Sequence, residues 1–296
     1  METKRYQVRK PRRTRRHVVR DIDYAVHEWG EPDSPLLLCL HGWGDSGATF
    51  QSFVDALSES WHIVAPDWRG FGDSGRNAGA YWYPDYVADL SVLVNIYSPD
   101  APVAILGHSM GGNVAGLYAG VFPERVRAFV NAEGFGLADS DPDSAPARYR
   151  RWIERLAVEE TFSVYRDYAS LAAKIHGRNP RMSRAYAQFV AEQWAREQDG
   201  QITLKADPRH RLPNAVLYRR AEAEACWRAV TAPVLMLTGA NSSFRQAGHP
   251  HDGRFDFELP FPRVSKLTLP DCGHMLHFEA PGPFAAAASD FLRQTV

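Results

Sequence analysis

The sequence predicts an α/β protein in which a mostly parallel sheet carries helices on both of its faces. Short, continuously apolar runs alternate with helical patterns, and the links between them are short. Such runs are typical of strands that are buried on both faces. The chain has 296 residues, of which 45% are hydrophobic, and this is enough to bury a large core. The alternation stops after Leu137 and resumes at Val234, so we expect one insertion in the core.

Each expected strand is a short apolar run that is ended by a turn residue. These runs are His17–Arg20, Asp23–Trp29, Leu36–Leu40, His62–Ala65, Val103–Leu106, Val126–Ala132, Val234–Leu237 and Val264–Leu269. The expected helices of the core show apolar residues at helical spacing. They are Thr49–Leu57, Tyr86–Tyr97, Asn113–Val121 and Pro283–Arg293. The order of strands and helices favours parallel pairing. A crossover helix brings the chain back to the end of the sheet at which the previous strand began, so that the next strand runs in the same direction.

The stretch of residues 138–230 differs from the rest because it contains no convincing strand. It carries helical patterns at Tyr149–Val158, Phe162–Ile175 and Arg184–Arg196. A loop of this length without secondary structure is uncommon in a compact protein. We therefore expect a core made of residues 21–137 and 231–296, interrupted by a helical cap at 138–230.

Charge is balanced overall but concentrated at the start of the chain. Lys and Arg number 34 against 35 Asp and Glu, so the net charge is −1 and a wholly basic nucleic-acid coat is excluded; no nucleic-acid partner is expected. Residues 1–20 form a basic arm with nine bases and one acid, Glu2. Two interpretations stay open, a frayed and solvated leader or an arm that contacts an anionic surface.

Three observations bear on the expected location. No apolar run approaches the roughly 20 residues of a membrane-spanning helix, and the first residues lack the apolar stretch of a signal peptide. Cys39, Cys226 and Cys272 are far apart and show no CxxC spacing, which argues against a zinc site or a disulfide framework. Scattered thiols suit a reducing compartment, so we expect a cytoplasmic location. The oligomeric state stays open.

The segment Gly107-His108-Ser109-Met110-Gly111 carries the chemistry that the sequence predicts. It matches G-x-S-x-G, follows an apolar strand directly and opens a helix. Glycines on both sides of the serine leave room where a Cβ would collide with backbone. The hydroxyl of Ser109 would then stand above the carboxyl ends of the strands, where the helix N-terminus favours developing negative charge. The alternative is a serine in a glycine-rich turn without chemistry.

A serine hydroxyl needs a base to become a good nucleophile. His274 follows a glycine just beyond the last expected strand and is the preferred base over the nearby His277. An oxyanion needs backbone donors, and a glycine-rich turn follows the first long buried strand at residues 41–44. We expect the backbone N–H groups of Trp43 and Met110 to form an oxyanion hole. The Trp43 side chain would roof the pocket or serve packing alone.

Four motifs occur in the order seen in the α/β-hydrolase superfamily. They are His41-Gly42-Trp43, Asp67-Trp-Arg69-Gly-Phe-Gly-Asp73-Ser74, Gly107-His-Ser109-Met-Gly-Gly112 and Gly273-His274. The resemblance covers roughly residues 20–137 and 231–296, and the stretch between them resembles the variable cap of that superfamily. It implies the α/β-hydrolase fold and a triad in the chain order nucleophile, acid, base.

The resemblance also gives an expectation for the second motif, which is similar to the loop after the fourth strand in that superfamily. We interpret Asp67, Arg69 and Asp73 as structural residues rather than catalytic ones. They would hold this loop through charge-assisted hydrogen bonds.

The acid of the triad is where the chain departs from the superfamily. Most members place it at the fourth position of a Gly-x-x-Asp segment that here begins at Gly239, and that position holds the uncharged Ser242. The later acids are Asp252, Asp256 and Glu258, which lie well past the end of the strand.

Glu133 ends the preceding strand and offers a carboxylate in place of the missing one. Some α/β-hydrolases, including a branch of the haloalkane dehalogenases, are similar in using an acid after this earlier strand. Since the acid only has to orient the imidazole and stabilise its cation, either loop can supply it. We therefore predict Glu133 as the triad acid. The alternative is a hinge residue of the cap that pairs with an arginine.

These residues predict a serine hydrolase that cleaves a carboxylic ester of a small or medium acyl or aromatic substrate through an acyl-enzyme. A serine at the elbow excludes the dehalogenases and epoxide hydrolases of this fold, which need an aspartate there. The same triad is compatible with a lactonase, a C–C bond hydrolase, a perhydrolase or a hydroxynitrile lyase, and the fold with a non-catalytic ligand-binding protein. No metal-ligand spacing or phosphate loop is present, so no metal or cofactor is expected.

The expected cap is rich in aromatic residues and in arginine. Aromatic side chains there could line an apolar pocket or form the core of the cap. The arginines could hold an anionic end of a substrate or pair with nearby acids, and the sequence does not decide between the two.

Overall fold

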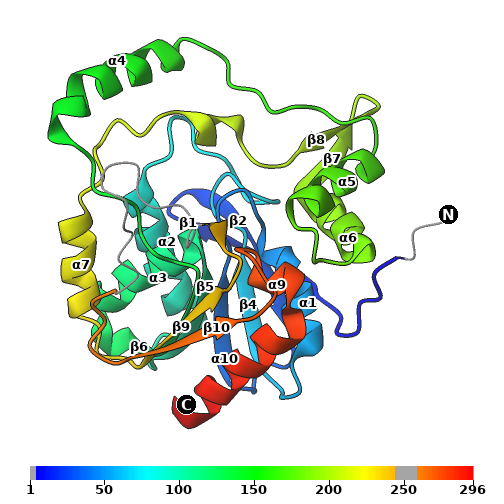
Figure 1. Cartoon of the computed structure of the whole chain (residues 1–296), viewed down its shortest axis with the longest axis vertical. Helices are drawn as coiled ribbons and strands as arrows, with labels where there is room; N and C mark the ends of the chain where they lie inside the picture. Colours follow the sequence, from blue (N-terminus) through cyan, green and yellow to red (C-terminus); the bar gives the residue numbers. More distant parts are fainter. Residues whose placement is uncertain (1–4, 244–258, 296) are drawn as a thin grey trace.

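The protein is built on an eight-stranded sheet that carries helices on both faces (Figure 1). A computed structural model describes residues 5–243 and 259–295. The strands lie in the order β1-β2-β4-β3-β5-β6-β9-β10. Strand β2 is antiparallel to both of its neighbours, and the strands from β4 to β10 pair in parallel. The expected α/β-hydrolase fold with a mostly parallel sheet is confirmed.

The elements of the core follow the expected order, with boundaries that differ by a few residues. The strands are β1 (Arg13–Val19), β2 (Ile22–Trp29), β3 (Leu36–Leu40), β4 (His62–Pro66), β5 (Val103–His108), β6 (Val126–Ala132), β9 (Val234–Gly239) and β10 (Val264–Leu269). The helices are α1 (Gln51–Ala56), α2 (Tyr83–Tyr97), α3 (Met110–Val121), α9 (Leu276–Glu279) and α10 (Pro281–Thr295). Within the described ranges, no helix is both long and apolar enough to cross a lipid bilayer.

Strand β3 shows why its sequence is apolar at every position. Its side chains alternate between the two faces of the sheet, and both faces are covered. Leu38 and Leu40 pack into the cluster beneath α2 and α3, whereas Leu37 and Cys39 pack into the cluster beneath α1 and α10. The strand is thereby fixed in the middle of the sheet, and the turn that follows it at residues 41–44 is carried on a rigid support.

Between β6 and β9, residues 138–230 form a segment that crosses the carboxyl ends of the strands, and we call it the inserted segment. It contains α4 (Ala145–Leu156), α5 (Tyr168–Arg178), α6 (Arg184–Trp194), the strands β7 (Ala195–Gln198) and β8 (Gln201–Leu204), and α7 (Arg220–Arg228). Figure 1 shows α4 on one side of the molecule and α5, α6 and the β7–β8 pair on the other. The extent of a cap domain at 138–230 stays a proposal.

Two features of this segment differ from the sequence-based expectation. The prediction of no strand is wrong, because β7 and β8 form a hairpin whose two turn residues, Asp199 and Gly200, have φ values of 52° and 73°. An Asp-Gly pair is a strong hairpin signal that the analysis of this stretch did not use. The second difference concerns helix α7, which packs against the core helix α3 beside the sheet. The two helices are so close that a Cβ added to Gly120 of α3 would lie 2.0 Å from the carbonyl oxygen of Cys226 in α7.

The first residues are not a frayed leader, and that interpretation is wrong for residues 5–19. Residues 13–19 form β1, which pairs with β2 along its full length. Before it, Asp55 of α1 accepts hydrogen bonds from the Tyr6 hydroxyl (2.8 Å) and from the backbone N–H groups of Arg9 and Lys10 (3.1 and 2.8 Å). The Tyr6 ring also packs on Tyr186 of α6, at 4.7 Å between ring centroids. A buried acceptor and an aromatic contact therefore order the basic segment.

Candidate active site

Ser109 lies at the turn between β5 and α3, in a backbone conformation that few side chains adopt. Its φ and ψ are 52° and −116°, and it precedes the first residue of α3. The flanking glycines make this turn possible. A Cβ at Gly107 would lie 2.5 Å from the Gly111 carbonyl oxygen, and one at Gly111 would lie 2.2 Å from the Leu40 carbonyl oxygen. A strained backbone is a common feature of functional sites.

The structure brings the three expected residues into one hydrogen-bonded chain. His274 follows β10, and its Nε2 lies 3.0 Å from the Ser109 Oγ. Its Nδ1 lies 3.0 Å from Oε2 of Glu133, at the end of β6. The carboxylate can only accept, so Nδ1 carries the proton and donates it, and the unprotonated Nε2 accepts from the serine hydroxyl. This is the arrangement in which an imidazole acts as a base toward a serine.

Glu133 is buried at 2% exposure and held by donors from the neighbouring strand. The backbone N–H of Gly239 donates to its Oε1 at 2.8 Å, and the Ser242 hydroxyl donates to its Oε2. Among the described residues its ion-pair partner is His274 and not an arginine, so the structure does not support the hinge alternative. The other acids considered, Asp252, Asp256 and Glu258, lie outside the described residues.

The sequence analysis missed two residues that position this carboxylate. Ser242 stands where most superfamily members carry the acid, and it contributes a hydrogen bond to Glu133 in place of a charge. The Asn131 side chain closes the turn around Glu133, whose φ is 61°, by bonding the backbone N–H and C=O of Gly134 at 3.0 and 2.9 Å. The sequence carried one signal for Asn131, which is that an asparagine stands two residues before a glutamate at the end of a strand.

The turn that carries Trp43, one of the two predicted oxyanion donors, lies beside the serine. A Cβ on Gly42 would be 3.1 Å from the Ser109 Cβ, so the turn before Trp43 passes directly over the nucleophile. His41 fixes this turn, because its Nε2 accepts from the Trp68 backbone N–H (2.9 Å) and its carbonyl accepts from the Trp68 indole (3.0 Å). Met110 follows Ser109 as the first residue of α3. The two backbone N–H groups predicted to bind an oxyanion therefore flank the nucleophile.

Comparison with known proteins bears directly on this arrangement. The sequence profile of the family described as alpha/beta hydrolase fold matches residues 35–281. The chain belongs to the α/β-hydrolase family. The match runs from β3 to the start of α10 and includes all three residues of the Ser109–His274–Glu133 chain.

Individual relatives agree with the family. A serine hydrolase-like protein of Danio rerio is 30% identical over 275 residues, which are 90% of this chain and 83% of the relative. A 3-hydroxybutyrate-oligomer hydrolase of Cupriavidus necator is 27% identical over 288 residues, which are 90% of this chain and 92% of the relative. Among solved structures, the thioesterase domain from the curacin biosynthetic pathway covers 95% of this chain and 99% of its own, with a TM-score of 0.84 at 21% identity. That structural likeness shows the fold.

His277, the weaker candidate for the base, is placed in a buried cluster behind the nucleophile of this α/β-hydrolase family member. Its Nε2 lies 3.2 Å from Oδ2 of Asp45. Burial would raise the pKa of Asp45, but the hydrogen bond and charge of His277 outweigh it and lower that pKa below its ordinary value. One ligating atom each of Asp45, His108 and His277 lie within 4.8 Å of one another, so the cluster is where a metal ion would find ligands. Asp45 lies in the loop after β3, His108 ends β5 and His277 lies in α9, so their spacing in the sequence did not reveal the cluster.

We expect His277→Ala to reduce stability and to spare catalysis. The substitution removes a hydrogen-bond donor from a buried carboxylate and leaves a void beside Phe50, on which the ring stacks. The expected loss in the free energy of unfolding is about 2–4 kcal/mol, measured by urea denaturation. The turnover per folded molecule should stay within a few-fold of the wild type. A stable variant without activity would contradict the assignment of the base to His274.

The loop after β4 is held by the carboxylate of Asp67, as the resemblance led us to expect. Asp67 accepts from the backbone N–H groups of Gly47 (2.7 Å) and Asp73 (2.8 Å), and it lies 3.2 Å from Nε2 of His27. Burial would raise the pKa of Asp67, but the imidazole of His27 and these hydrogen bonds lower it to about 2. The carboxylate therefore joins β2, the loop and the turn before α1.

The other two charged residues of this loop also act as ties. Arg69 binds Asp89 of α2 through two hydrogen bonds of 2.5 and 2.6 Å. Asp73 forms an ion pair with Lys205, at 3.0 Å, and so joins the loop to the inserted segment. The expected hydrogen bonds of this loop are confirmed.

Asp67→Asn is expected to weaken the protein most at neutral pH. The folded-state pKa of about 2 lies below the ordinary value of 3.8, so the charged form stabilises the fold above about pH 4. That contribution, on the order of 2 kcal/mol, is lost as the pH falls toward 2. Denaturant unfolding at several pH values should show a large deficit of the variant at pH 7 that shrinks toward pH 2. A deficit that does not depend on pH would contradict the role of the charge.

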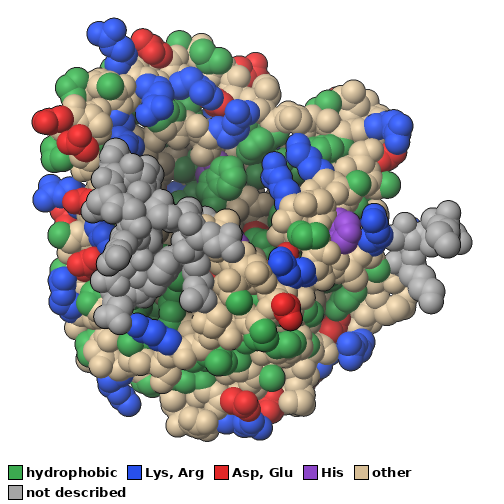
Figure 2. All heavy atoms as spheres, in the orientation of Figure 1, with side chains coloured by type: hydrophobic (Ala, Val, Ile, Leu, Met, Phe, Trp, Pro, Cys, Tyr) green, Lys and Arg blue, Asp and Glu red, His purple; other side chains and the backbone are tan. Residues whose placement is uncertain are grey.

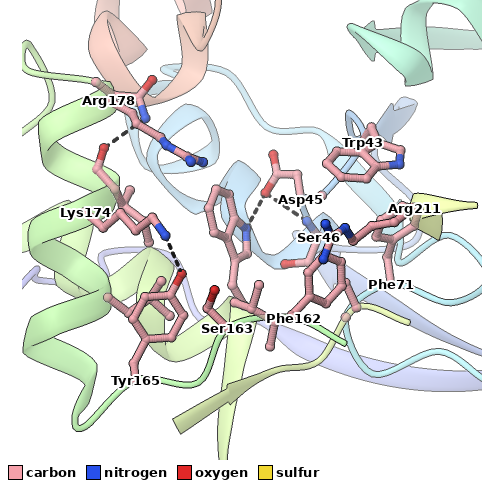
Figure 3. Close-up of a pocket in the computed structure, with 18 residues that line it drawn as sticks. Trp43, Asp45, Ser46, Phe71, Phe162, Ser163, Tyr165, Lys174, Arg178 and Arg211 are labelled. Carbon is pink, nitrogen blue, oxygen red and sulfur yellow. Dashed lines mark hydrogen bonds between the residues drawn. The ribbon is translucent and has the colours of Figure 1, made fainter. Parts of the chain in front are cut away.

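A cavity of about 540 Å³ lies between the turn at residues 43–46 and the inserted segment (Figure 3). Trp43 is 55% exposed and forms part of its wall, edge-on to Phe71 at 6.4 Å. Ser109 does not line this cavity, and the chain runs from the cavity wall at Trp43 to Gly42, which lies beside the nucleophile. Figure 2 shows the corresponding hollow between α4 and the α5–α6 pair. Trp43 thus lines a cavity, and its role as the roof over the nucleophile stays a prediction.

Proposed function

We propose that the protein is a serine hydrolase that cleaves carboxylic esters and needs no cofactor or metal. The observation that carries this proposal is the continuous chain from Ser109 through His274 to Glu133, with both hydrogen bonds at 3.0 Å. A hydroxyl, an imidazole and a buried carboxylate in this order form the apparatus of acyl transfer.

In the first half of the reaction, the Ser109 Oγ attacks the ester carbonyl while Nε2 of His274 takes the hydroxyl proton. The carboxylate of Glu133 stabilises the imidazolium that forms. The carbonyl oxygen becomes an oxyanion and accepts hydrogen bonds from the backbone N–H groups of Trp43 and Met110. The C–O bond to the alcohol then breaks, and His274 returns the proton to the leaving alcohol.

In the second half, water replaces the alcohol. His274 takes a proton from the water as its oxygen attacks the acyl-enzyme carbonyl, and a second oxyanion forms in the same place. The bond to the Ser109 Oγ breaks, the proton passes from His274 to the serine, and a carboxylic acid leaves. The cycle consumes one ester and one water and regenerates the hydroxyl.

The size of the cavity supports a small or medium substrate. A volume of about 540 Å³ lies within the range of small-molecule sites, and aromatic side chains form much of its wall. The relative from Cupriavidus necator is named for hydrolysis of 3-hydroxybutyrate oligomers, whose units are joined by ester bonds, and this also favours an ester. The same apparatus serves a lactone, a C–C bond, perhydrolysis or hydroxynitrile lysis, so the panel that tests the proposal has to include competing substrates.

The test is the activity of the purified full chain on 4-nitrophenyl esters of increasing acyl length and on a set of lactones, measured with and without EDTA. We expect ester hydrolysis, with a preference for short or medium chains, and covalent labelling of Ser109 by a fluorophosphonate. Labelling without turnover on any ester would favour a ligand-binding protein. Activity that EDTA removes and a divalent ion restores would contradict the cofactor-free mechanism.

A further inference from the structure

The cavity next to Trp43 has an excess of positive charge that the proposed chemistry does not use. Among the described residues, its lining includes three cationic side chains and one acid. The cations are Lys174, Arg178 and Arg211, and the acid is Asp45. Figure 3 shows Arg178 and Arg211 reaching toward the space from different sides, with Lys174 beside Tyr165.

The single acid does not balance these cations. Asp45 is 3% exposed, and its Oδ1 already accepts from the Trp194 indole (2.7 Å), the Thr49 hydroxyl (2.7 Å) and the Ser46 backbone N–H (2.8 Å). Its Oδ2 faces His277. The carboxylate is therefore turned into the protein and satisfied there.

The cations also lack ion-pair partners in the described part of the chain. No described carboxylate lies within 4.0 Å of the charged nitrogens of Lys174, Arg178 or Arg211. Lys174 donates to the Tyr165 hydroxyl at 3.2 Å, and Arg211 donates to the Thr161 carbonyl at 2.7 Å, both of which are neutral acceptors. The sequence left open whether the arginines of this segment pair with nearby acids. Arg178 and Arg211 do not pair with any acid in the described part of the chain.

Two of these cations lie close enough on one helix to repel each other, although Lys174 also lies over the Tyr165 ring, 5.3 Å from its centroid. Lys174 and Arg178 are four residues apart on α5 and therefore lie on the same face of the helix. Like charges at this spacing destabilise a helix by a few tenths of a kcal/mol. Arg178 lies in the last turn, where a cation suits the helix dipole, but this does not account for Lys174 or for Arg211, which belongs to another element. A ligand that carries negative charge would relieve this repulsion.

We propose that the cavity binds an anionic group, a carboxylate or a phosphate-like group, at the end of the substrate remote from the scissile bond. This inference rests on the proposed function and names the substrate class of the same site. The ester would lie under Trp43 at Ser109, the uncharged middle would pack on Trp43 and Phe71, and the anion would lie between Arg178 and Arg211. Two guanidinium groups offer planar pairs of donors that match an oxyanion, and a hollow lined by one sign of charge concentrates such ligands.

The test compares 4-nitrophenyl esters whose six-atom acyl chains end in a methyl group, a carboxylate or a phosphonate. We expect the wild type to prefer a charged ester, by kcat/KM, over the methyl-ended one. In Arg178→Gln with Arg211→Gln, this preference should fall about 10- to 100-fold, the range for hydrogen bonds to charged groups, while the methyl-ended ester is hydrolysed as before. The phosphonate and carboxylate arms show which anion is preferred.

Arg166→Gln is the matched control, since Arg166 lies on the same segment, is 86% exposed and pairs with Asp167 away from the cavity. It should keep the wild-type preference. An unchanged preference in the double variant, or an equal fall in the control, would overturn the inference.

Failure of the proposed function can be told apart from failure of this inference. If no ester is hydrolysed, calorimetry of Ser109→Ala with the carboxylate-ended ester replaces the kinetic measurement. Binding that weakens at least tenfold when Arg178 and Arg211 are replaced would keep the anion site and discard the hydrolase. Absence of binding, or binding that is indifferent to both arginines, would discard the anion site.

Discussion

Replacement of Ser109 by alanine is expected to abolish ester hydrolysis and leave the fold intact. The loss should be on the order of 10⁶ in kcat, by comparison with other serine hydrolases. In the proposed mechanism the Oγ forms the acyl-enzyme, and this atom lies 3.0 Å from Nε2 of His274. Alanine has the same Cβ as serine and does not change the backbone strain at φ 52°. We therefore expect the turn at residue 109 to keep its shape. The measurement is turnover of the best 4-nitrophenyl ester, with circular dichroism as the test of folding.

The companion variant His274→Ala should lose a similar factor, because nucleophile and base act as a unit and their losses do not add. Residual activity above a few per cent in a preparation free of contaminating esterase would refute the assignment of Ser109. Loss of labelling by a fluorophosphonate in Ser109→Ala, and its survival in His277→Ala, would separate the nucleophile from its surroundings.

Glu133→Gln is the second change for which we expect a large effect. The amide keeps the shape of the side chain but removes the charge that stabilises the imidazolium of His274, and it can present a donor where Nδ1–H needs an acceptor. The expected loss is on the order of 10⁴ in kcat, which is less than for the nucleophile or base. A fully active Glu133→Gln would show that another carboxylate serves as the acid.

Ser242 makes a sharper version of this experiment possible. Its hydroxyl touches the same Oε2 that faces His274. In the wild type, Ser242→Asp would bring two carboxylates into contact and should harm both stability and activity. In the Glu133→Gln background, the same substitution supplies the missing charge from the neighbouring strand and should recover part of the lost kcat. We therefore expect Ser242→Asp to lower kcat in the wild type and to raise it in the Glu133→Gln variant. Equal losses of kcat in both would contradict this expectation.

The parts of this protein that could be predicted from its sequence are those with short-range signals. The elbow needs glycine on both sides of Ser109, a buried strand before it and a helix after it, and all of these lie within a dozen residues. His274 follows a glycine after a strand in the same way. Ser242 carries no carboxylate at the usual position of the acid, and Glu133 at the end of the preceding strand was predicted to replace it. The structure places the Glu133 side chain against His274.

What could not be predicted depends on contacts between distant loops. Nothing in the spacing of Asp45, His108 and His277 indicates that they meet. They lie in the loop after β3, at the end of β5 and in α9, and only the fold brings these elements together. The role of Ser242 as a donor appears only once β6 and β9 are neighbours. The basic stretch at the N-terminus gave a misleading signal, because contacts with the fold order it. These contacts are made by the Tyr6 side chain, by backbone N–H groups and by the Arg12 side chain.

The contacts of residues 5–12 also determine which segments would have to be exchanged together in a chimera with a relative. Tyr6 lies between Asp55 of α1 and Tyr186 of α6, and Arg12 donates to Gln193 of α6 at 3.0 Å. Helix α6 thus depends on a strip of chain that lies more than 150 residues away in the sequence. A chimera that borrowed only residues 138–230 from a relative would break this strip, whereas one that borrowed the first dozen residues as well would transfer a complete unit. The modular boundary of the inserted segment therefore includes the amino terminus.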